Sequence, residues 1–246
     1  MMTTLDLLAI GAHPDDVELG CGGTLARLAG AGRCIGILHL TRGEMGTRGT
    51  VEERVREAER AAEVLGATTL DFLDCGDGGL RTGSAEEDAL IELLRRHRPR
   101  LVLGPSPSDR HPDHGRAHRL VAAAAFYAGL RNRSPERGGD GAHRPAAVYS
   151  YMQHDLFEPR FVVDVSSAWE RKLAALACYT SQLHQPGAAA RSEPVTKVST
   201  PEFSRAVEGR ARHFGLIIGA AFGEPFWTPQ PIAVGDPLAT VPGGVL

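Results

Sequence analysis

Two short polar motifs in this 246-residue chain have residue types that could do chemistry. The first reads Ala-His-Pro-Asp-Asp-Val-Glu over residues 12–18, and the second reads Ser-Asp-Arg-His-Pro-Asp-His over residues 108–114. A catalytic zinc takes three nitrogen or oxygen ligands from the protein and keeps a fourth position for water. His13, Asp16 and His114 can supply that set. Such a site carries net positive charge, which activates water and polarises an amide carbonyl, so the predicted chemistry is hydrolysis.

The other polar residues of the two motifs suit roles in proton transfer. Asp15 cannot easily share a metal with its neighbour in a tight turn, so we predict that it is the general base for the attacking water. His111 is near enough to His114 to donate to a developing oxyanion or to protonate the leaving amine. Asp113 could orient one of the imidazoles. Each motif alone is more often structural, and only the combination favours a site.

Hydrophobic periodicity predicts alternating strands and helices that would bring the two motifs together. Strands are expected at residues 5–10, 35–40, 70–73, 101–103, about 148–152 and 161–165. Helices are expected over 22–32, from 51 to 65, after 84, over 115–129 and about 167–179, and from Thr200-Pro201 onward. Capping boxes at Thr50 and Ser84 mark two of the helix starts. The order predicts one Rossmann-like α/β domain over residues 1–246, with a mostly parallel sheet flanked by helices and its ligands at the carboxyl ends of the strands.

The two motifs, with the Gly-Cys-Gly-Gly-Thr run at 20–24, resemble the LmbE-like (PIG-L) N-acetylglucosaminyl deacetylases. The resemblance implies the same roles as the residue types do: His13, Asp16 and His114 hold zinc and Asp15 is the base. It also implies that the histidine at position 111 stabilises the oxyanion or acts as the acid. These assignments imply a hydrolase that removes an N-acetyl group.

Further segments extend the resemblance over nearly the whole chain, at residues 40–50, 161–165, 178–182 and 223–226. They look most like the bacillithiol-biosynthesis branch, whose members deacetylate N-acetylglucosaminyl-malate. Arg54 resembles an arginine of the family that reaches the substrate, and Arg110 could meet an anionic aglycone such as malate. The resemblance leaves open a mycothiol precursor, a chitooligosaccharide, an antibiotic pseudo-aglycone or a thiol-conjugate amide as the substrate.

Composition indicates a small-molecule enzyme of the cytoplasm. The formal charge of −3 comes from charges scattered along the chain, so neither a nucleic-acid nor a membrane surface is expected. No signal peptide or membrane-spanning stretch is expected either. The four cysteines lack the CxxC spacing of a thiolate zinc site. The family often forms homo-oligomers, but no feature of this sequence sets a subunit number.

Two alternative interpretations from other classes of protein fit the sequence less well, as do two further histidines as members of the site. A nucleotide-binding module would need its glycines directly after the first strand, where residues 13–16 intervene. A non-catalytic metal-binding protein would leave Asp15 without a use. His39 and His154 are expected to be packed or solvent-exposed rather than part of a site.

Overall fold

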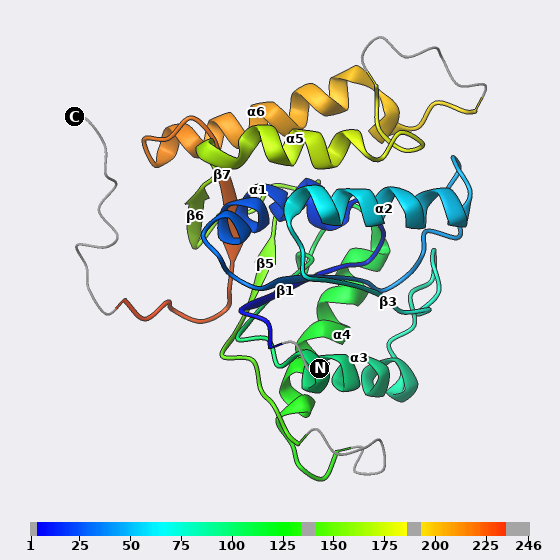
Figure 1. Ribbon diagram of the computed structural model, residues 1–246, viewed down its shortest axis with the longest axis vertical. Helices are drawn as coiled ribbons and strands as arrows, with labels where there is room; N and C mark the ends of the chain where they lie inside the picture. The colour runs from blue at the N-terminus through cyan, green and yellow to red at the C-terminus, as the bar shows by residue number, and fades with distance from the viewer. Residues whose placement is uncertain (1–3, 134–140, 186–192, 235–246) are drawn as a thin grey trace.

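The computed structural model describes residues 4–133, 141–185 and 193–234 as one α/β domain around a central sheet (Figure 1). Seven strands lie in the order β3-β2-β1-β4-β5-β7-β6; β1 to β5 pair in parallel, and β7 runs antiparallel to both of its neighbours, β5 and β6. Their bounds are β1 Leu7–Gly11, β2 Ile35–His39, β3 Thr69–Phe72, β4 Leu101–Gly104, β5 Ala147–Tyr151, β6 Phe161–Asp164 and β7 Gly223–Trp227. Strands β1 and β2 are buried along their whole length, which explains why they read as continuous apolar runs. The predicted mostly parallel sheet is confirmed.

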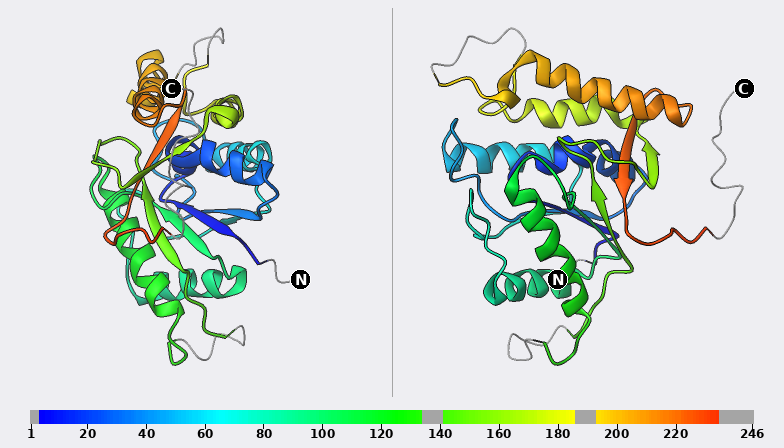
Figure 2. Two further views of the ribbon diagram at one scale, coloured as in Figure 1. Left: turned by 90° about the vertical axis from the view of Figure 1, so that its left-hand side faces the viewer. Right: turned by 180° about the vertical axis from the view of Figure 1, so that it is seen from behind.

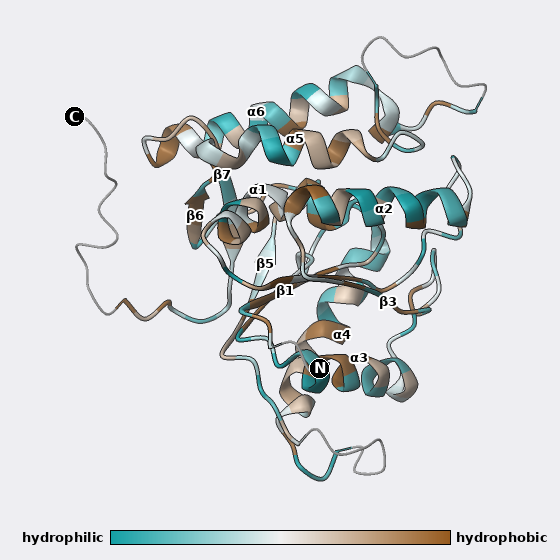
Figure 3. Ribbon diagram, viewed as in Figure 1, coloured by the Kyte–Doolittle hydropathy of each residue, from teal (hydrophilic) through white to brown (hydrophobic). Residues whose placement is uncertain are grey.

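Helices cover both faces of the sheet in the described residues. Helices α1 and α2 lie on one face with α5 and α6 outside them, and α3 and α4 cover the other face (Figures 1 and 2). Their bounds are α1 Asp16–Gly30, α2 Val51–Leu65, α3 Ser84–His97, α4 Pro112–Ala128, α5 Trp169–Ala177 and α6 Pro201–Ile217. The sheet separates two apolar cores, and hydrophobic residues follow its central strands (Figure 3). Among the described helices, none has the length and apolar character that crossing a bilayer requires.

Several local features differ from what the sequence led us to expect. Helix α1 begins at Asp16 and is kinked at Cys21, so the helix expected from residue 22 is its second segment; the preceding segment from Asp16, with Asp16 and Glu18 in its first turn, was not expected. The capping box at Ser84 does not form, because Gly83 is the N-cap of α3 and Ser84 is its first residue. Strand β7 was not expected, because a proline interrupts its short sequence. The sequence also predicts exposed loops at residues 132–145 and 185–200, and both ranges lie partly outside the described residues.

A buried carboxylate on β7 holds α1 in place. Helix α1 breaks at Cys21, where φ is −144°, and this break leaves backbone N–H groups free inside the helix. Glu224 accepts hydrogen bonds from the Gly23 and Thr24 amides at 2.9 and 2.7 Å. It also accepts a hydrogen bond from the Thr24 hydroxyl at 2.6 Å and forms an ion pair with Lys172 Nζ at 2.6 Å, and the side chains of Glu224 and Lys172 are only 2% exposed. Glu224 therefore ties the helix that follows the first motif to the far end of the sheet.

Replacing Glu224 with glutamine should strongly destabilise the fold. The Glu224→Gln variant leaves the Lys172 ammonium buried without its counter-charge, and breaking a buried pair in this way costs about 3–5 kcal/mol. Urea unfolding measures the loss. Glu202→Gln, which removes an exposed pair with Arg205, is the control and should cost less than about 1 kcal/mol. Equal losses of unfolding free energy in the two variants would contradict this role of Glu224.

Candidate metal centre

The first motif forms a strained turn between β1 and α1. Asp15 has φ of 102°, a left-handed conformation that costs a non-glycine residue about 1–3 kcal/mol. Two contacts hold the turn in this shape. The His13 amide donates to Asp16 Oδ2 at 2.9 Å, and the guanidinium of Arg54 on α2 donates to the Pro14 carbonyl at 2.7 Å. The turn thereby places three polar side chains at the carboxyl end of β1.

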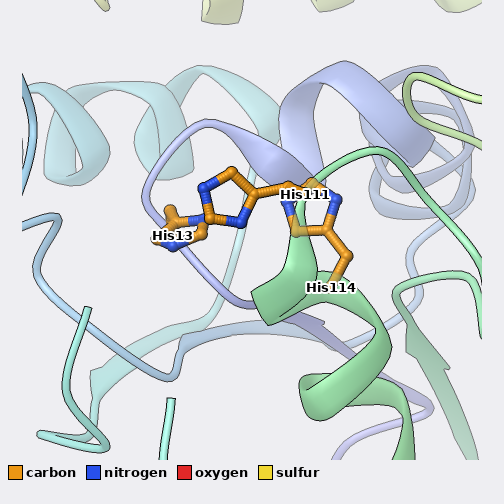
Figure 4. Close-up of side chains that lie close together, drawn as sticks. All are labelled: His13, His111 and His114. Atoms are coloured by element: carbon orange, nitrogen blue, oxygen red, sulfur yellow. The ribbon is translucent and has the colours of Figure 1, made fainter. Parts of the chain in front are cut away.

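The second motif lies at the same edge of the sheet because β4 is the parallel neighbour of β1. His111 is the N-cap of α4, and Pro112 is the first residue of the helix. His114 follows in the first turn of α4, so its ring and that of His111 share one side of the helix start. Figure 4 shows these two rings beside His13, which comes from the turn after β1. The expected convergence of the two loops is therefore present.

The Asp16 carboxylate lies between two imidazoles. Its Oδ2 is 3.5 Å from His13 Nδ1, and its Oδ1 is 3.4 Å from His114 Nε2. The outer nitrogens of both rings face other carboxylates: His13 Nε2 is 3.0 Å from Asp77 and 3.5 Å from Asp113, and His114 Nδ1 is 3.4 Å from Asp109. All three of the predicted metal ligands are buried. Each imidazole therefore turns one nitrogen toward Asp16 and the other toward an acidic partner.

Electrostatics show that the centre fits a cation. Burial lowers the pKa of His114, but the neighbouring Asp16 and Asp109 outweigh it and raise this pKa to about 9. Burial alone would raise the pKa of Asp16, but His114 and His13 hold it well below the ordinary range. The buried acidic groups thus draw protons onto the imidazoles, and a bound divalent cation would supply the same positive charge. The donor set of imidazole and carboxylate suits zinc.

Other combinations of ligands also lie close enough to hold a metal. Among the described residues, three groups offer ligand atoms within 4.8 Å of one another: His13, His111 and His114; Asp109, His114 and His154; and His13, Asp77 and Asp113. The predicted set of His13, Asp16 and His114 is not one of these groups, although Asp16 contacts both of its histidines. The choice of Asp16 over His111 as the third ligand therefore stays a prediction.

Asp15 is a buried carboxyl group beside this cluster. Burial raises its pKa to about 7, although the guanidinium of Arg54, 3.9 Å away, acts to lower it. A carboxyl group with such a pKa can both take and release a proton near neutral pH, as a general base must. Arg54 itself is only 5% exposed and donates to backbone carbonyls. Its predicted contact with substrate stays a prediction, whereas its contacts with the Asp15 turn are present.

The contacts of His111 define which of its nitrogens can donate. The Asp113 backbone amide donates to His111 Nδ1 at 3.2 Å, so the neutral ring carries its proton on Nε2. Burial, and then the nearby His13 and His114, lower the pKa of His111 below its ordinary value. The ring is therefore a neutral donor at physiological pH, which suits the predicted contact with an oxyanion.

Asp113 lies where an orienting residue would be, and Arg110 lies at the exposed rim. Asp113 faces the outer nitrogen of His13 and is itself held by the Gly78 and Leu80 amides at 2.8 and 3.0 Å. Arg110 is exposed. Its predicted role in binding an anion stays a prediction.

Some residues of the centre were missed in the sequence. Asp77 and Gln153 follow other strands and belong to no motif, yet Asp77 faces His13 and Gln153 donates to Asp16. His154 stacks on His114 with ring centroids 5.7 Å apart, so the expectation that it lies away from the site is wrong. His39, by contrast, is fully buried as expected, and burial lowers its pKa to about 3.

The segment at residues 178–182 forms hydrogen bonds to the elements that carry the site. The Tyr179 hydroxyl donates to Glu18 at 3.0 Å, and Ser181 donates to Glu57 on α2 through its amide and hydroxyl at 2.7 and 2.6 Å. Gln182 then donates to the Arg48 carbonyl at 2.7 Å. These contacts fix α1, α2 and the segment before α2 relative to one another. These contacts give a structural role to a segment whose sequence is otherwise marked only by its resemblance to the family.

The mostly parallel sheet carries a buried imidazole–carboxylate cluster at its carboxyl edge, where a metal ion could be held. The family model described as PIG-L, GlcNAc-PI de-N-acetylase, matches residues 8–125. A diacetylchitobiose deacetylase of Thermococcus kodakarensis is 37% identical over 188 residues, which cover 72% of this chain and 69% of the relative. The chain belongs to the PIG-L (LmbE-like) deacetylase family, hydrolases that act on amide bonds.

Two further comparisons concern a solved structure with a similar fold and a relative named for another reaction. A conserved protein of Thermus thermophilus has a solved structure with a TM-score of 0.84 and 38% identity, and the match covers 95% of this chain and 98% of that one. A 4-oxalmesaconate hydratase of Pseudomonas putida is 30% identical over 194 residues, 72% of this chain and 74% of the relative. Sequence similarity of this degree therefore also extends to a protein named for a different reaction.

The buried Glu18 should make stability depend on pH. Burial raises the pKa of its carboxyl group to about 8, so between pH 4.5 and 8 the unfolded chain loses a proton that the folded chain retains. Stability therefore falls as pH rises through this range. Glu18→Gln keeps an acceptor for Tyr179 but has no proton to lose, so its stability relative to the native chain should improve by about 2–4 kcal/mol from pH 4.5 to 8.

Urea unfolding of the metal-free protein at several pH values measures this difference. Glu59→Gln, on the exposed side of α2, is the matched control and should leave the pH dependence of the native chain unchanged. A Glu18→Gln curve parallel to that of the native chain would show that Glu18 is ionised in the folded state.

Proposed function

We propose that the protein is a zinc-dependent deacetylase that hydrolyses the N-acetyl group of N-acetylglucosaminyl-malate, releasing acetate and glucosaminyl-malate. The observation that carries the deacetylase part is the buried Asp15 beside the cluster of His13, Asp16 and His114. Membership of a family of amide hydrolases supports the same chemistry. The malate aglycone rests on the resemblance of segments outside the motifs and on the exposed guanidinium of Arg110.

In this proposal His13, Asp16 and His114 hold the metal, which when bound polarises the acetyl carbonyl and acidifies water. Asp15 takes the proton from the attacking water, because its buried carboxyl group has a pKa near 7. His111 donates from Nε2 to the oxygen of the tetrahedral intermediate. Protonation of the leaving amine then falls to Asp15, which holds the proton taken from water, or to His111. Arg54 keeps the Asp15 turn in place during both proton transfers.

Diacetylchitobiose is the second candidate substrate. The relative from Thermococcus kodakarensis is named for this compound and is 37% identical to the chain. Both candidates present an N-acetylglucosaminyl group to the metal and differ in what is attached to it. The negative charge of malate would favour Arg110 at the rim, whereas a second sugar would need neutral hydrogen-bonding partners.

Two substitutions should separate metal binding from proton transfer. His114→Ala removes a metal ligand, so metal and activity should be lost together. Asp15→Asn keeps the ligands, so metal content should stay while kcat falls about 10²–10⁴-fold. Metal analysis and initial rates on the same preparations measure both effects. Asp6→Asn, beside an exposed arginine far from the site, is the control and should change neither. A fully active Asp15→Asn enzyme would remove Asp15 from its role as base.

Substrate choice is tested with zinc-loaded protein and four compounds. N-acetylglucosaminyl-malate, N-acetylglucosaminyl-inositol and diacetylchitobiose are assayed for acetate and free amine, and 4-oxalmesaconate for hydration. We expect the highest kcat/KM with the malate compound and complete loss of turnover with a chelator. A preference for another acetylated sugar would keep the deacetylase and reject malate. Turnover of 4-oxalmesaconate alone would reject the deacetylase.

A further inference from the structure

The buried carboxylate of Asp109 lies on the side of His114 that faces away from Asp16. Its Oδ1 is 3.4 Å from His114 Nδ1, whereas Asp16 is 3.4 Å from the opposite nitrogen, Nε2. The Asp109 side chain is 0% exposed, and His114 is 2% exposed. His114 is therefore held between two carboxylates, one on each ring nitrogen.

Backbone amides from two segments fix the Asp109 carboxylate. The His154 amide donates to its Oδ2 at 3.1 Å, and the His111 amide donates to its Oδ1 at 3.4 Å. His154 follows β5, so the contact ties the loop after β4 to the loop after the next strand. Both of these donors are backbone groups, so neither can move away from the carboxylate without moving the main chain. This arrangement suits a residue that orients another.

We propose that Asp109 is a positioning residue that keeps the proton of neutral His114 on Nδ1 and so leaves the Nε2 lone pair free for the metal. The inference rests on the proposed metal site and adds to it a residue that touches neither metal nor substrate. The orienting role predicted for Asp113, which with Asp77 faces the outer nitrogen of His13, is of the same kind.

The competing tautomer explains why this orientation matters. A neutral imidazole carries one proton, and at His114 that proton has an acceptor on either side. With the proton on Nε2, the ring would donate to Asp16, and the nitrogen that should bind the metal would be blocked. The negative charge of Asp109 at Nδ1 favours the tautomer that can bind. Carboxylate partners of this kind typically change metal affinity about 10–100-fold.

The alternative to positioning is that Asp109 and His114 belong to a second metal site. Asp109, His114 and His154 offer ligand atoms within 4.8 Å of one another. Such a site would need His114 to bind a second cation through Nδ1. If Asp109 positions His114, the chain binds one zinc ion and His114 Nδ1 keeps its proton. If these residues form a second metal site, the chain binds two zinc ions and His114 Nδ1 carries no proton.

The test compares Asp109→Asn with the native chain and with a matched control. Asparagine keeps the size and a carbonyl acceptor but removes the charge. We expect zinc affinity, measured by competition with a chelator, to fall about 10–100-fold, with one zinc per native chain. Asp71→Asn is the control, because it breaks a similar pair, His97 Nε2 to Asp71 at 2.8 Å, away from the site. It should leave zinc affinity unchanged.

A spectroscopic measurement on the native chain needs no variant and covers the case in which Asp109→Asn fails to fold. Histidine ¹⁵N NMR of the zinc-loaded protein should show His114 protonated on Nδ1 and coordinated through Nε2. Coordination through Nδ1, two zinc ions per chain, or an Asp109→Asn affinity equal to that of the control would overturn the proposal. If the native chain binds no zinc, the proposed metal site itself fails. If the native chain binds zinc but Asp109→Asn and Asp71→Asn bind it equally well, the metal site stands and Asp109 does not position His114.

Discussion

The contact between Asp16 and the two histidines is the interaction on which the rest of the site depends. A buried carboxylate is costly unless it is paired, and Asp16 is paired at 3.5 and 3.4 Å with rings from two different loops. Those rings can meet Asp16 only because β1 and β4 are parallel neighbours. The outer carboxylates then hold the far sides of both rings. A cation at this point would satisfy charges that the fold has already brought together.

Much of the remaining structure keeps the first motif in a conformation that it would not adopt alone. The left-handed Asp15 is braced by Arg54, and the broken helix after it is braced by Glu224 and Lys172. Both braces are buried charges that reach the motif from distant parts of the chain. Strain at a site persists when its surroundings fix it in this way. Burial in this turn raises the pKa of Asp15, whereas the Arg54 guanidinium that braces the turn acts to lower it.

The strands of the sheet and the two polar motifs could be recognised from the sequence because each depends on residues that are close together in the chain. Apolar runs located the strands, and Thr50 marked the start of α2 at the residue that caps it. Strand β7 and the contacts of Asp77 and Gln153 depend on chain segments far apart, and no periodicity reports them. His154 was misjudged for the same reason, because its stacking on His114 follows from the adjacency of β4 and β5. The aglycone depends on surfaces that the motifs do not encode.

A crystal structure of the zinc-loaded protein, with the metal located by its anomalous signal, tests the central claim most directly. The account predicts one zinc bonded at about 2.0–2.2 Å to His13, Asp16 and His114, with Asp15 and His111 beside the open position. Zinc held by His13, His111 and His114, with Asp16 unbound, would contradict it, because His111 would then be a ligand and no longer free to donate to the oxyanion.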